Sequence, residues 1–419
     1  MIYITISIRK LCGMDNMTHS LVGLAFGELV DRALPPASEP ARGRIRRRAL
    51  LLTGLLASNF PDLDLVLTPL LPAPLGYLLH HRGHTHTLLY ALPQVALLLA
   101  LVWMLWPGAR RLLREDRGAR RAVVGTALLG MVLHLSFDAL NVYGVHPFHP
   151  FDSRWLYGDL VFIVEPVFWT ALGVALALLA GGRLLRWLLL AFFAAMPLLF
   201  ARLGFLQWGS LAGLGAVGLA VFVANRLRGP RAGLAVAALL CLGFVGIQGL
   251  AGHLARGEIG AQLARAAPGA RVLDIPLSSF PANPLCWSFA TVSEDAAAGR
   301  YEIRVGVLSL APGVTPVSRC PARFGGQPDS RDPALAWKYG EARGVADFRA
   351  LQRNNCHFDA WLRFARVPSL AGGRATDLRF GAPGEPNFSS LDYAARAAAP
   401  CPAPMPAWGY PRADLLGWK

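Results

Sequence analysis

The chain has 419 residues, of which 54% are hydrophobic and 16% are charged, and its formal net charge is +15. Soluble domains carry about 25% charged residues, so this composition excludes an ordinary soluble protein and favours one whose apolar surface faces lipid. We expect no nucleic-acid partner, because the arginines gather in short loops between apolar runs and no basic motif is interleaved with aromatic residues.

The first 16 residues contain no convincing signal peptide, because no long apolar core precedes a small-residue cleavage site. We therefore treat residues 1–16 as an extension that is flexible or non-native, and a better organised segment begins at Met17. Two apolar segments follow, at 18–31 and 48–60. Both are too short to span a bilayer comfortably, which takes about 20 residues, so we expect half-helices packed beside longer ones.

Longer apolar runs predict transmembrane helices. Four are clear, at 85–106, 160–180, 203–224 and 232–250, and two more are predicted at 122–140 and 184–201. The last of these is interrupted by Arg186 and Pro197. The chain is therefore predicted to form an all-α polytopic membrane bundle with about six to eight membrane segments.

The basic residues divide unequally between alternate loops. If the two short segments count as passes, the loops on one side carry 17 arginines and lysines and those on the other side carry 5. Cytoplasmic loops are the basic ones, which places the chain after residue 255 outside the cytoplasm. We expect a multi-pass protein of the bacterial inner (cytoplasmic) membrane with an extracytoplasmic C-terminal domain.

The chain after residue 255 has the composition of a small soluble α+β domain. Alternation with period two at 287–292 and 301–307, around a polar turn, predicts a hairpin, and 359–367 and 375–380 are further strand candidates. Four cysteines there suit two disulfides in an oxidising compartment, although three pairings, and four free thiols, remain open: Cys286, Cys320, Cys356 and Cys401. The predicted domains are a membrane domain with the candidate metal site at 17–180, additional transmembrane helices at 181–254 and this domain at 255–419.

Eight of the ten histidines precede residue 150, and the predicted topology brings their segments to one membrane face. His134 and Asp138 are four residues apart in a helical segment and therefore share one side of it. An ionisable pair inside a membrane segment is costly and usually has a partner or a function. The alternative is a structural hydrogen bond between packed helices.

Two further motifs reach the same face. Pro61 ends a helix and is followed by Asp62 and Asp64, whose carboxylates suit a divalent metal or simply a solvated turn. The segment 80–86 (HHRGHTH) holds four histidines, and its glycine allows a tight turn that aims their rings at one point. The alternative for this segment is a pH-sensitive or adventitious metal-binding loop.

Other polar residues are weaker candidates. His146 and His149 are predicted to be outer partners of the site or surface residues. Glu165 either accepts a hydrogen bond from a ligand histidine or is only a helix-start carboxylate. His357 lacks histidine neighbours and is predicted to be structural.

These motifs resemble the YdjM-type family of bacterial membrane-bound, metal-dependent hydrolases. The matching segments are 17–20 with Gly23, 61–64, 81–86, and 134–138 followed by 141–144, so the resemblance covers about residues 17–180. Shorter matches at 364–368 and 377–380 resemble the outer domain of longer members. The resemblance implies metal dependence and hydrolysis, and Glu165-Pro166 departs from the Asp expected before that proline.

The resulting hypothesis is a metal-activated water that attacks an ester, phosphoester or amide of a membrane-associated or lipid-linked substrate. Asp64 is the candidate general base and Arg82 the candidate clamp for an oxyanion or phosphate. Zn²⁺ is the expected metal, with Mn²⁺ as the alternative, and six candidate ligands imply outer partners or two metals. The candidate ligands are His19, Asp62, His84, His86, His134 and Asp138.

Two other classes remain open. A metal-ion or small-solute transporter also uses ionisable residues in membrane segments, but it predicts sites near the midplane and internal repeats. A membrane sensor would use the histidines as pH switches.

Overall fold

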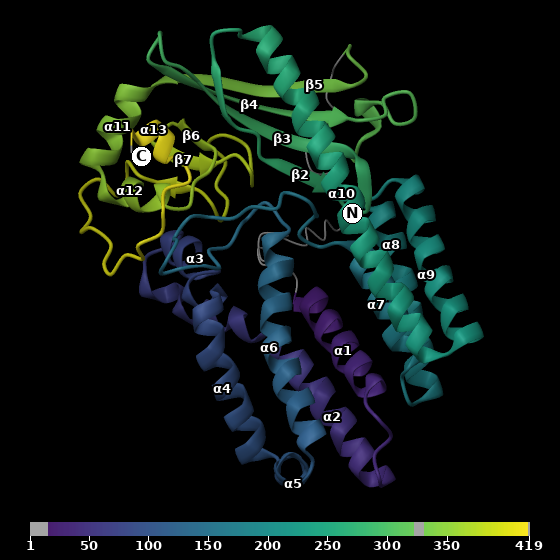
Figure 1. Cartoon of the computed structure of the whole chain (residues 1–419). Helices are drawn as coiled ribbons and strands as arrows, with labels where there is room; N and C mark the ends of the chain where they lie inside the picture. The colour runs from purple at the N-terminus through teal and green to yellow at the C-terminus, as the bar shows by residue number, and fades with distance from the viewer. Residues whose placement is uncertain (1–15, 322–330, 418–419) are drawn as a thin grey trace, which may run out of the picture.

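The structure is a computed structural model that describes residues 16–321 and 331–417, so the predicted N-terminal extension lies outside the described residues except for Asn16. Figure 1 shows a bundle of helices whose one end is covered by a β-sheet region. The helical part comprises α1 (Asn16–Ala33), α2 (Pro40–Ala57), the 3-10 segment η2 (Phe60–Leu70), α3 (Leu75–His80), η3 (His84–His86), α4 (Leu88–Leu105), α5 (Pro107–Glu115), α6 (Arg117–Ala139), α7 (Pro166–Leu178), α8 (Arg183–Arg202), α9 (Trp208–Arg228) and α10 (Pro230–Ala266).

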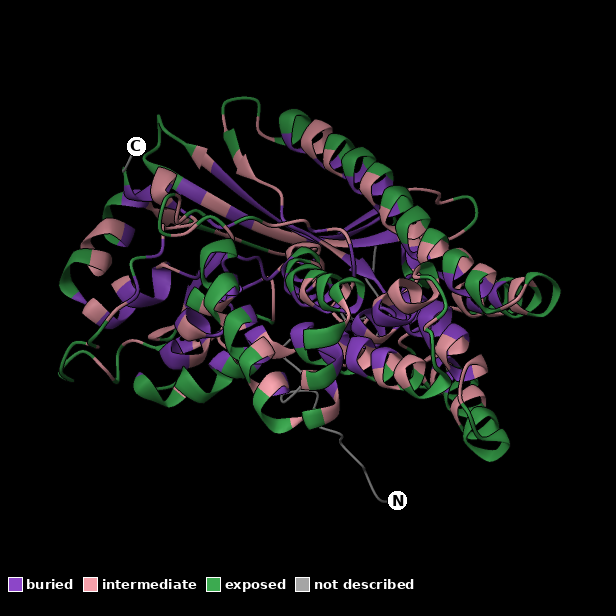
Figure 2. Ribbon diagram, turned by 60° about the horizontal axis from the view of Figure 1, so that its bottom comes forward, coloured by how far each residue is buried: buried purple, intermediate pink, exposed green. Residues whose placement is uncertain are grey.

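Within the described residues, six helical segments are long and apolar enough to cross a membrane, which fits a helical, multi-pass architecture. They are α2 continued by η2, α4, α6, α8, α9 and α10. Their outer sides are apolar and exposed (Figure 2): Leu105, Leu184 and Leu227 leave 77%, 74% and 78% of their surface open. Such surfaces suit lipid rather than water.

The run at 160–180, expected as a clear span, forms the shorter helix α7 instead. Residues 160–165 are not helical, and α7 begins at Pro166 and has 13 residues. Ten of these residues are buried, so α7 is a core helix surrounded by its neighbours. Its all-round apolarity, which resembles that of a membrane span, results from this burial.

Helices α1 and α2 cross closely because both carry glycine at the contact. A Cβ on Gly23 would lie 2.2 Å from the carbonyl oxygen of Gly54 and 2.1 Å from the Ser58 hydroxyl. A Cβ on Gly54 would lie 2.3 Å from the carbonyl oxygen of Gly23. Small residues of this kind allow helix backbones to approach in a membrane.

We expect Gly23→Ala to destabilise the protein by about 1–3 kcal/mol, because the added methyl must push the two helices apart. The measurement is the thermal midpoint in detergent. Gly125→Ala on α6 is the matched control, because a Cβ there would meet nothing within 4 Å. Equal midpoints for the two variants would contradict a tight crossing at Gly23.

The C-terminal region is α+β, as predicted. Its elements are β1 (Arg271–Asp274), β2 (Leu277–Phe280), β3 (Asn283–Asp295), β4 (Arg300–Ser309), η4 (Val317–Arg319), β5 (Leu335–Gly344), α11 (Val345–Asn354), α12 (Cys356–Leu362), β6 (Pro368–Ala371), β7 (Arg374–Asp377), β8 (Leu391–Asp392) and α13 (Ala413–Leu416). The larger sheet is antiparallel with the order β1-β3-β4-β5, and β2 also pairs with β3; β6, β7 and β8 form a second sheet.

The predicted hairpin is confirmed as β3 and β4, which pair from Cys286 with Ser309 to Asp295 with Arg300. The strand predicted at 359–367 is wrong, because α12 occupies its first residues and Asn355 caps that helix by accepting the Phe358 N–H. The strand predicted at 375–380 is correct only in part, since β7 ends at Asp377.

The bundle and the sheet share one continuous helix. The C-terminal turns of α10 pack Ala255, Ile259 and Leu263 against Leu277 and Trp287 of the sheet. The predicted boundary between 254 and 255 therefore falls inside α10 rather than in a linker.

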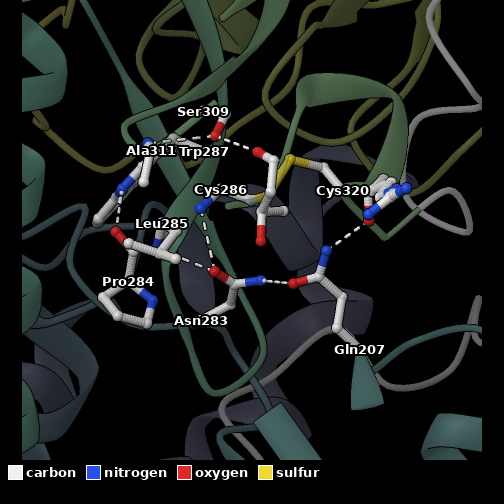
Figure 3. The surroundings of a disulfide bond; sticks show 11 residues. Gln207, Asn283, Pro284, Leu285, Cys286, Trp287, Ser309, Ala311 and Cys320 are labelled. Atoms are coloured by element: carbon white, nitrogen blue, oxygen red, sulfur yellow. Dashed lines mark hydrogen bonds between the residues drawn. A yellow bond between two sulfur atoms is a disulfide. The ribbon is translucent and has the colours of Figure 1, made fainter. Parts of the chain in front are cut away.

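Two disulfides join the four C-terminal cysteines, Cys286 with Cys320 and Cys356 with Cys401. Figure 3 shows the first beside a polar contact with the bundle, in which Asn283 Nδ2 donates to Gln207 Oε1 over 2.7 Å. Gln207 in turn donates from Nε2 to the carbonyl oxygen of Arg319. This disulfide therefore stabilises the part of the sheet region that faces the start of α9.

Candidate metal centre

Four buried side chains from three segments meet at the sheet-facing end of the bundle: Asp62 on η2, His86 on η3, and His134 and Asp138 on α6. One ligand atom of each lies within 4.8 Å of all the others. His86 Nε2 lies 3.0 Å from His134 Nε2, 3.2 Å from Asp138 Oδ2 and 3.4 Å from Asp62 Oδ1.

Local sequence explains how each side chain reaches this point. α2 ends at Ala57, and Pro61 lies in the first turn of η2, which turns Asp62 inward. Thr87 caps α4 by accepting the Tyr90 N–H, so His86 stands just before the helix. The spacing of four puts His134 and Asp138 on one side of α6, as predicted.

The hydrogen bonds of the two histidines decide which ring nitrogens face the centre. His134 Nδ1 lies 2.7 Å from the Ser58 carbonyl oxygen, and His86 Nδ1 lies 3.0 Å from Asp64 Oδ2. A carbonyl and an ionised carboxylate only accept, so each Nδ1 carries the proton and, in a neutral ring, each Nε2 presents a lone pair.

In these neutral tautomers, two Nε2 lone pairs and two carboxylates face one another. Such an arrangement is repulsive unless a cation lies among the four groups. The pKa of His86 reflects the negative charge of the surrounding carboxylates. Burial lowers this pKa, but Asp64, Asp138 and Asp62 together raise it well above its ordinary value. Two imidazoles and two carboxylates are a donor set that suits Zn²⁺ or Mn²⁺.

His19, another predicted ligand, lies at the edge of this group. Its Nε2 is 3.4 Å from Asp138 Oδ1, and its ring stacks on His134 with centroids 3.9 Å apart. The structure thus brings five of the six predicted ligands together, with His19 positioned as a fifth donor.

The sixth predicted ligand, His84, lies apart from this group. His84 and His86 are two residues apart in a 3-10 turn, which advances about 120° per residue, so their side chains diverge. The His84 ring stacks on Tyr90 and His149 and meets the edge of Trp408. His84 therefore belongs to an aromatic cluster at the end of α4.

Asp64 was predicted as a general base, but its oxygens already have several partners. Oδ2 accepts from the Arg82 N–H and the Thr85 hydroxyl, both at 2.9 Å, as well as from His86. Oδ1 lies 3.2 Å from His81 Nδ1. Asp64 therefore holds the ligand loop in place, and with Asp62 and His81 it forms a second group of ligand atoms within 4.8 Å of one another.

Arg82 was predicted to clamp a substrate, but its side chain is only 1% exposed. Its Nη2 lies 2.9 Å from Asp138 Oδ1, and its Nη1 donates to Asn141 Oδ1 and to the Asp138 carbonyl oxygen. Its guanidinium also lies over the Tyr143 ring at 4.8 Å. Arg82 thus orients Asp138 and offsets the negative charge of the centre.

The remaining candidates are structural. His146 is buried between Trp155 and Trp408, and burial lowers its pKa to about 3. Glu165 caps α7 by accepting the Val167 N–H and also accepts the Ala282 N–H, which matches the helix-start alternative. His357 donates from Nε2 to the Pro400 carbonyl oxygen in the C-terminal region.

Sequence reasoning missed two parts of the centre. Ser58 contributes its backbone carbonyl, for which no side-chain pattern exists. Asn141, three residues after Asp138, was noticed only within a motif of the family resemblance. Its polarity directly after an apolar helix is the signal that could have identified it as a partner of Arg82.

The fold and the centre define a polytopic membrane protein with a buried histidine–aspartate cluster at the end of its helical bundle. Residues 14–209, a little under half of the chain, match the model of the family described as YdjM inner membrane protein. The description places the family in the inner membrane and names no reaction.

One curated relative is similar to part of the chain. The uncharacterized protein YfhP of Bacillus subtilis (strain 168) is 29% identical over 170 residues, which are 40% of this chain and 47% of YfhP. The alignment thus spans about half the length of that relative. No solved structure matches the chain.

Proposed function

We propose that the protein is a membrane-bound, metal-dependent hydrolase whose divalent cation is held by Asp62, His86, His134 and Asp138. The observation that carries the proposal is the convergence of two histidine Nε2 atoms and two carboxylates inside the bundle, with each Nδ1 bound to an acceptor on the far side of its ring. A divalent cation supplies Lewis acidity and makes water more acidic.

The residues around the centre have the roles that such a site requires. Asp64 and the Ser58 carbonyl fix the tautomers of His86 and His134, and Arg82 orients Asp138. Asp62 is the most accessible of the four, with 7% of its side chain exposed against 0–1% for the others. A substrate would therefore approach from the side of Asp62.

That side favours an amphiphilic substrate. Several of the residues that follow Asp62 on η2 are apolar and open: Leu63 is 53% exposed, Val66 74% and Leu70 59%. An apolar surface beside the most accessible ligand suits an ester, phosphoester or amide that is carried by a lipid or a similar membrane-bound molecule.

Hydrolysis of p-nitrophenyl esters and bis-p-nitrophenyl phosphate by the detergent-purified chain tests the proposal. We expect a rate that needs added Zn²⁺ or Mn²⁺, is lost in Asp62→Ala and falls about 10- to 100-fold in Asp64→Asn, which disturbs only the support of His86. His84→Ala is the control and should keep the rate. Bound metal without turnover of either substrate would favour the transporter or sensor hypotheses.

We further propose that the chain after α10 lies on the extracytoplasmic side. Two observations support this orientation. The basic helix α5 lies at the end of the bundle away from the sheet (Figure 1). The region after α10 holds both disulfides.

Alkaline phosphatase, which is active only where its disulfides form, gives a direct measurement of this orientation. A fusion after Lys419 is expected to be active, and a truncation fused after Asp116, between α5 and α6, is expected to be inactive. The reverse pattern would overturn the proposed orientation.

A further inference from the structure

A cavity of about 810 Å³ lies between the sheet and the end of the bundle, outside the metal centre. Its floor comes from the segment after α6 and the segment before α7, and its roof from β2, β3, β4 and β5 with the loop after β7. The lining includes Asn141, Val161, Ile163, Ser279, Val305 and Lys338. This volume lies in the range of sites that hold small ligands.

Two polar atoms of the lining can donate hydrogen bonds that no described residue accepts. Asn141 Nδ2 and Ser279 Oγ are buried and have no hydrogen-bond partner among the described residues. Buried polar atoms without a partner are costly, so their persistence at a cavity wall points to a ligand that accepts from them.

Lys338 adds a positive charge to these donors. It is one of only three lysines among 41 basic residues, and no ion pair within the described part of the chain includes it. The register between β4 and β5 shifts beside it, between Val305 and Gly306, and such bulges redirect a side chain. Burial lowers the pKa of Lys338, which an anionic ligand would reverse. The lining holds one carboxylate, that of Glu385, which is exposed at the rim.

The opposite wall is apolar and leads towards the membrane helices. Val161, Phe162 and Ile163 line the cavity immediately before α7 begins at Pro166. A ligand that fits both walls has an anionic head for Lys338, Asn141 and Ser279 and an apolar part for Val161 to Ile163.

We propose that this cavity binds an anionic membrane amphiphile, with its charged headgroup at Lys338 and its chain directed towards the bundle. The site does not depend on the proposed hydrolase activity. The cavity and the metal centre share a residue, however. Asn141 lines the cavity, and its Oδ1 accepts a hydrogen bond from Arg82, which in turn pairs with Asp138.

Native mass spectrometry of the delipidated full chain tests the proposal, with phosphatidylglycerol, phosphatidylcholine and inorganic phosphate as separate probes. We expect one phosphatidylglycerol to be retained per chain, with affinity about tenfold weaker in Lys338→Met, since one charge-assisted contact is removed. Val305→Trp should block retention by filling the cavity. Arg265→Met removes a charge whose side chain is 64% exposed elsewhere, and it should have no effect.

Three results would overturn the proposal. One is equal retention of both lipids by all variants. The second is an equal loss of phosphatidylglycerol in Lys338→Met and Arg265→Met, which would mean that positive charge attracts the lipid without a specific site. The third is competition by inorganic phosphate without retention of lipid, which would indicate a site for a soluble anion. Thermal midpoints of the variants separate loss of binding from loss of folding.

Discussion

His134→Ala is expected to remove the metal from the purified protein, whereas His84→Ala is expected to leave it in place. His134 offers its Nε2 to the centre and has its Nδ1 fixed by the Ser58 carbonyl, so its removal takes away one of the four donors. His84 lies in the aromatic cluster with Tyr90 and His149. The measurement is bound Zn and Mn per chain, by elemental mass spectrometry in detergent.

Asp138→Asn and Asp64→Asn extend this comparison. Asparagine keeps the shape of Asp138 but removes the charge that balances a cation, so metal should be lost as in His134→Ala. Asp64 contacts His86 at Nδ1, the ring nitrogen that faces away from the centre. Asp64→Asn should therefore retain metal, with affinity reduced about 10- to 100-fold. Equal metal content in His134→Ala, His84→Ala and the wild type would show that the cluster holds no metal.

Titration of the metal-free protein with Zn²⁺ or Mn²⁺ distinguishes one bound metal ion per chain from two. Asp62, Asp64 and His81 form a second group of ligand atoms that shares Asp62 with the first. One metal per chain would assign Asp64 and His81 to support of the first group. Two metals, with His81→Gln losing only one, would assign them as ligands of a second.

The sequence predicted the main parts of this centre because its local rules are strong. A spacing of four residues on a helix places His134 beside Asp138 whatever the rest of the chain does, and a proline before Asp62 keeps the α-helix from continuing past it. The roles within the 80–86 segment could not be predicted. The direction of each ring there depends on a 3-10 turn and on Arg82, whose φ of 59° places it in a left-handed conformation.

The role of Arg82 could not be predicted from the sequence for a related reason. An arginine beside histidines near a membrane surface suggests an exposed clamp, but its partners Asp138 and Asn141 lie more than 50 residues away. The same limit applies to α7 and α12, where apolar residues alone could not distinguish a span from a core helix, or a strand from a short helix. Tertiary contacts decided each case.

Arg366→Met is expected to destabilise the contact between the bundle and the C-terminal region by about 1.5–3 kcal/mol, because the Asp159 and Asp274 carboxylates each lose one of their two arginine partners. Arg366 Nη1 lies 2.9 Å from Asp159 Oδ1, and its Nε lies 2.8 Å from Asp274 Oδ2. Burial lowers the pKa of Arg366, but the two carboxylates raise it above the ordinary value, so the group stays charged. Asp159 belongs to the segment between α6 and α7, whereas Arg366 belongs to the C-terminal region.

A double-mutant cycle distinguishes this pairing from a general effect of the substitution. Asp159→Asn should also destabilise the protein, but less. It removes the ion pair between Asp159 Oδ2 and Arg256 Nη2, which are 2.9 Å apart, but the Arg256 side chain is 37% exposed and can be solvated instead. The double variant should cost less than the sum of the single variants by about 0.5–3 kcal/mol, since neither charge is then left without the other. Arg154→Met, which removes an arginine that is 84% exposed beside Asp152, should stay within about 1 kcal/mol of the wild type.

Urea unfolding in detergent, followed by tryptophan fluorescence, measures these differences. A strong coupling would mean that the C-terminal region holds the segment that carries Asn141, and through Arg82 supports the orientation of Asp138. Additive losses would mean instead that the two parts touch at Asp159 without depending on each other. The metal centre would then be stabilised by the bundle alone, and removal of Arg366 would leave bound metal unchanged.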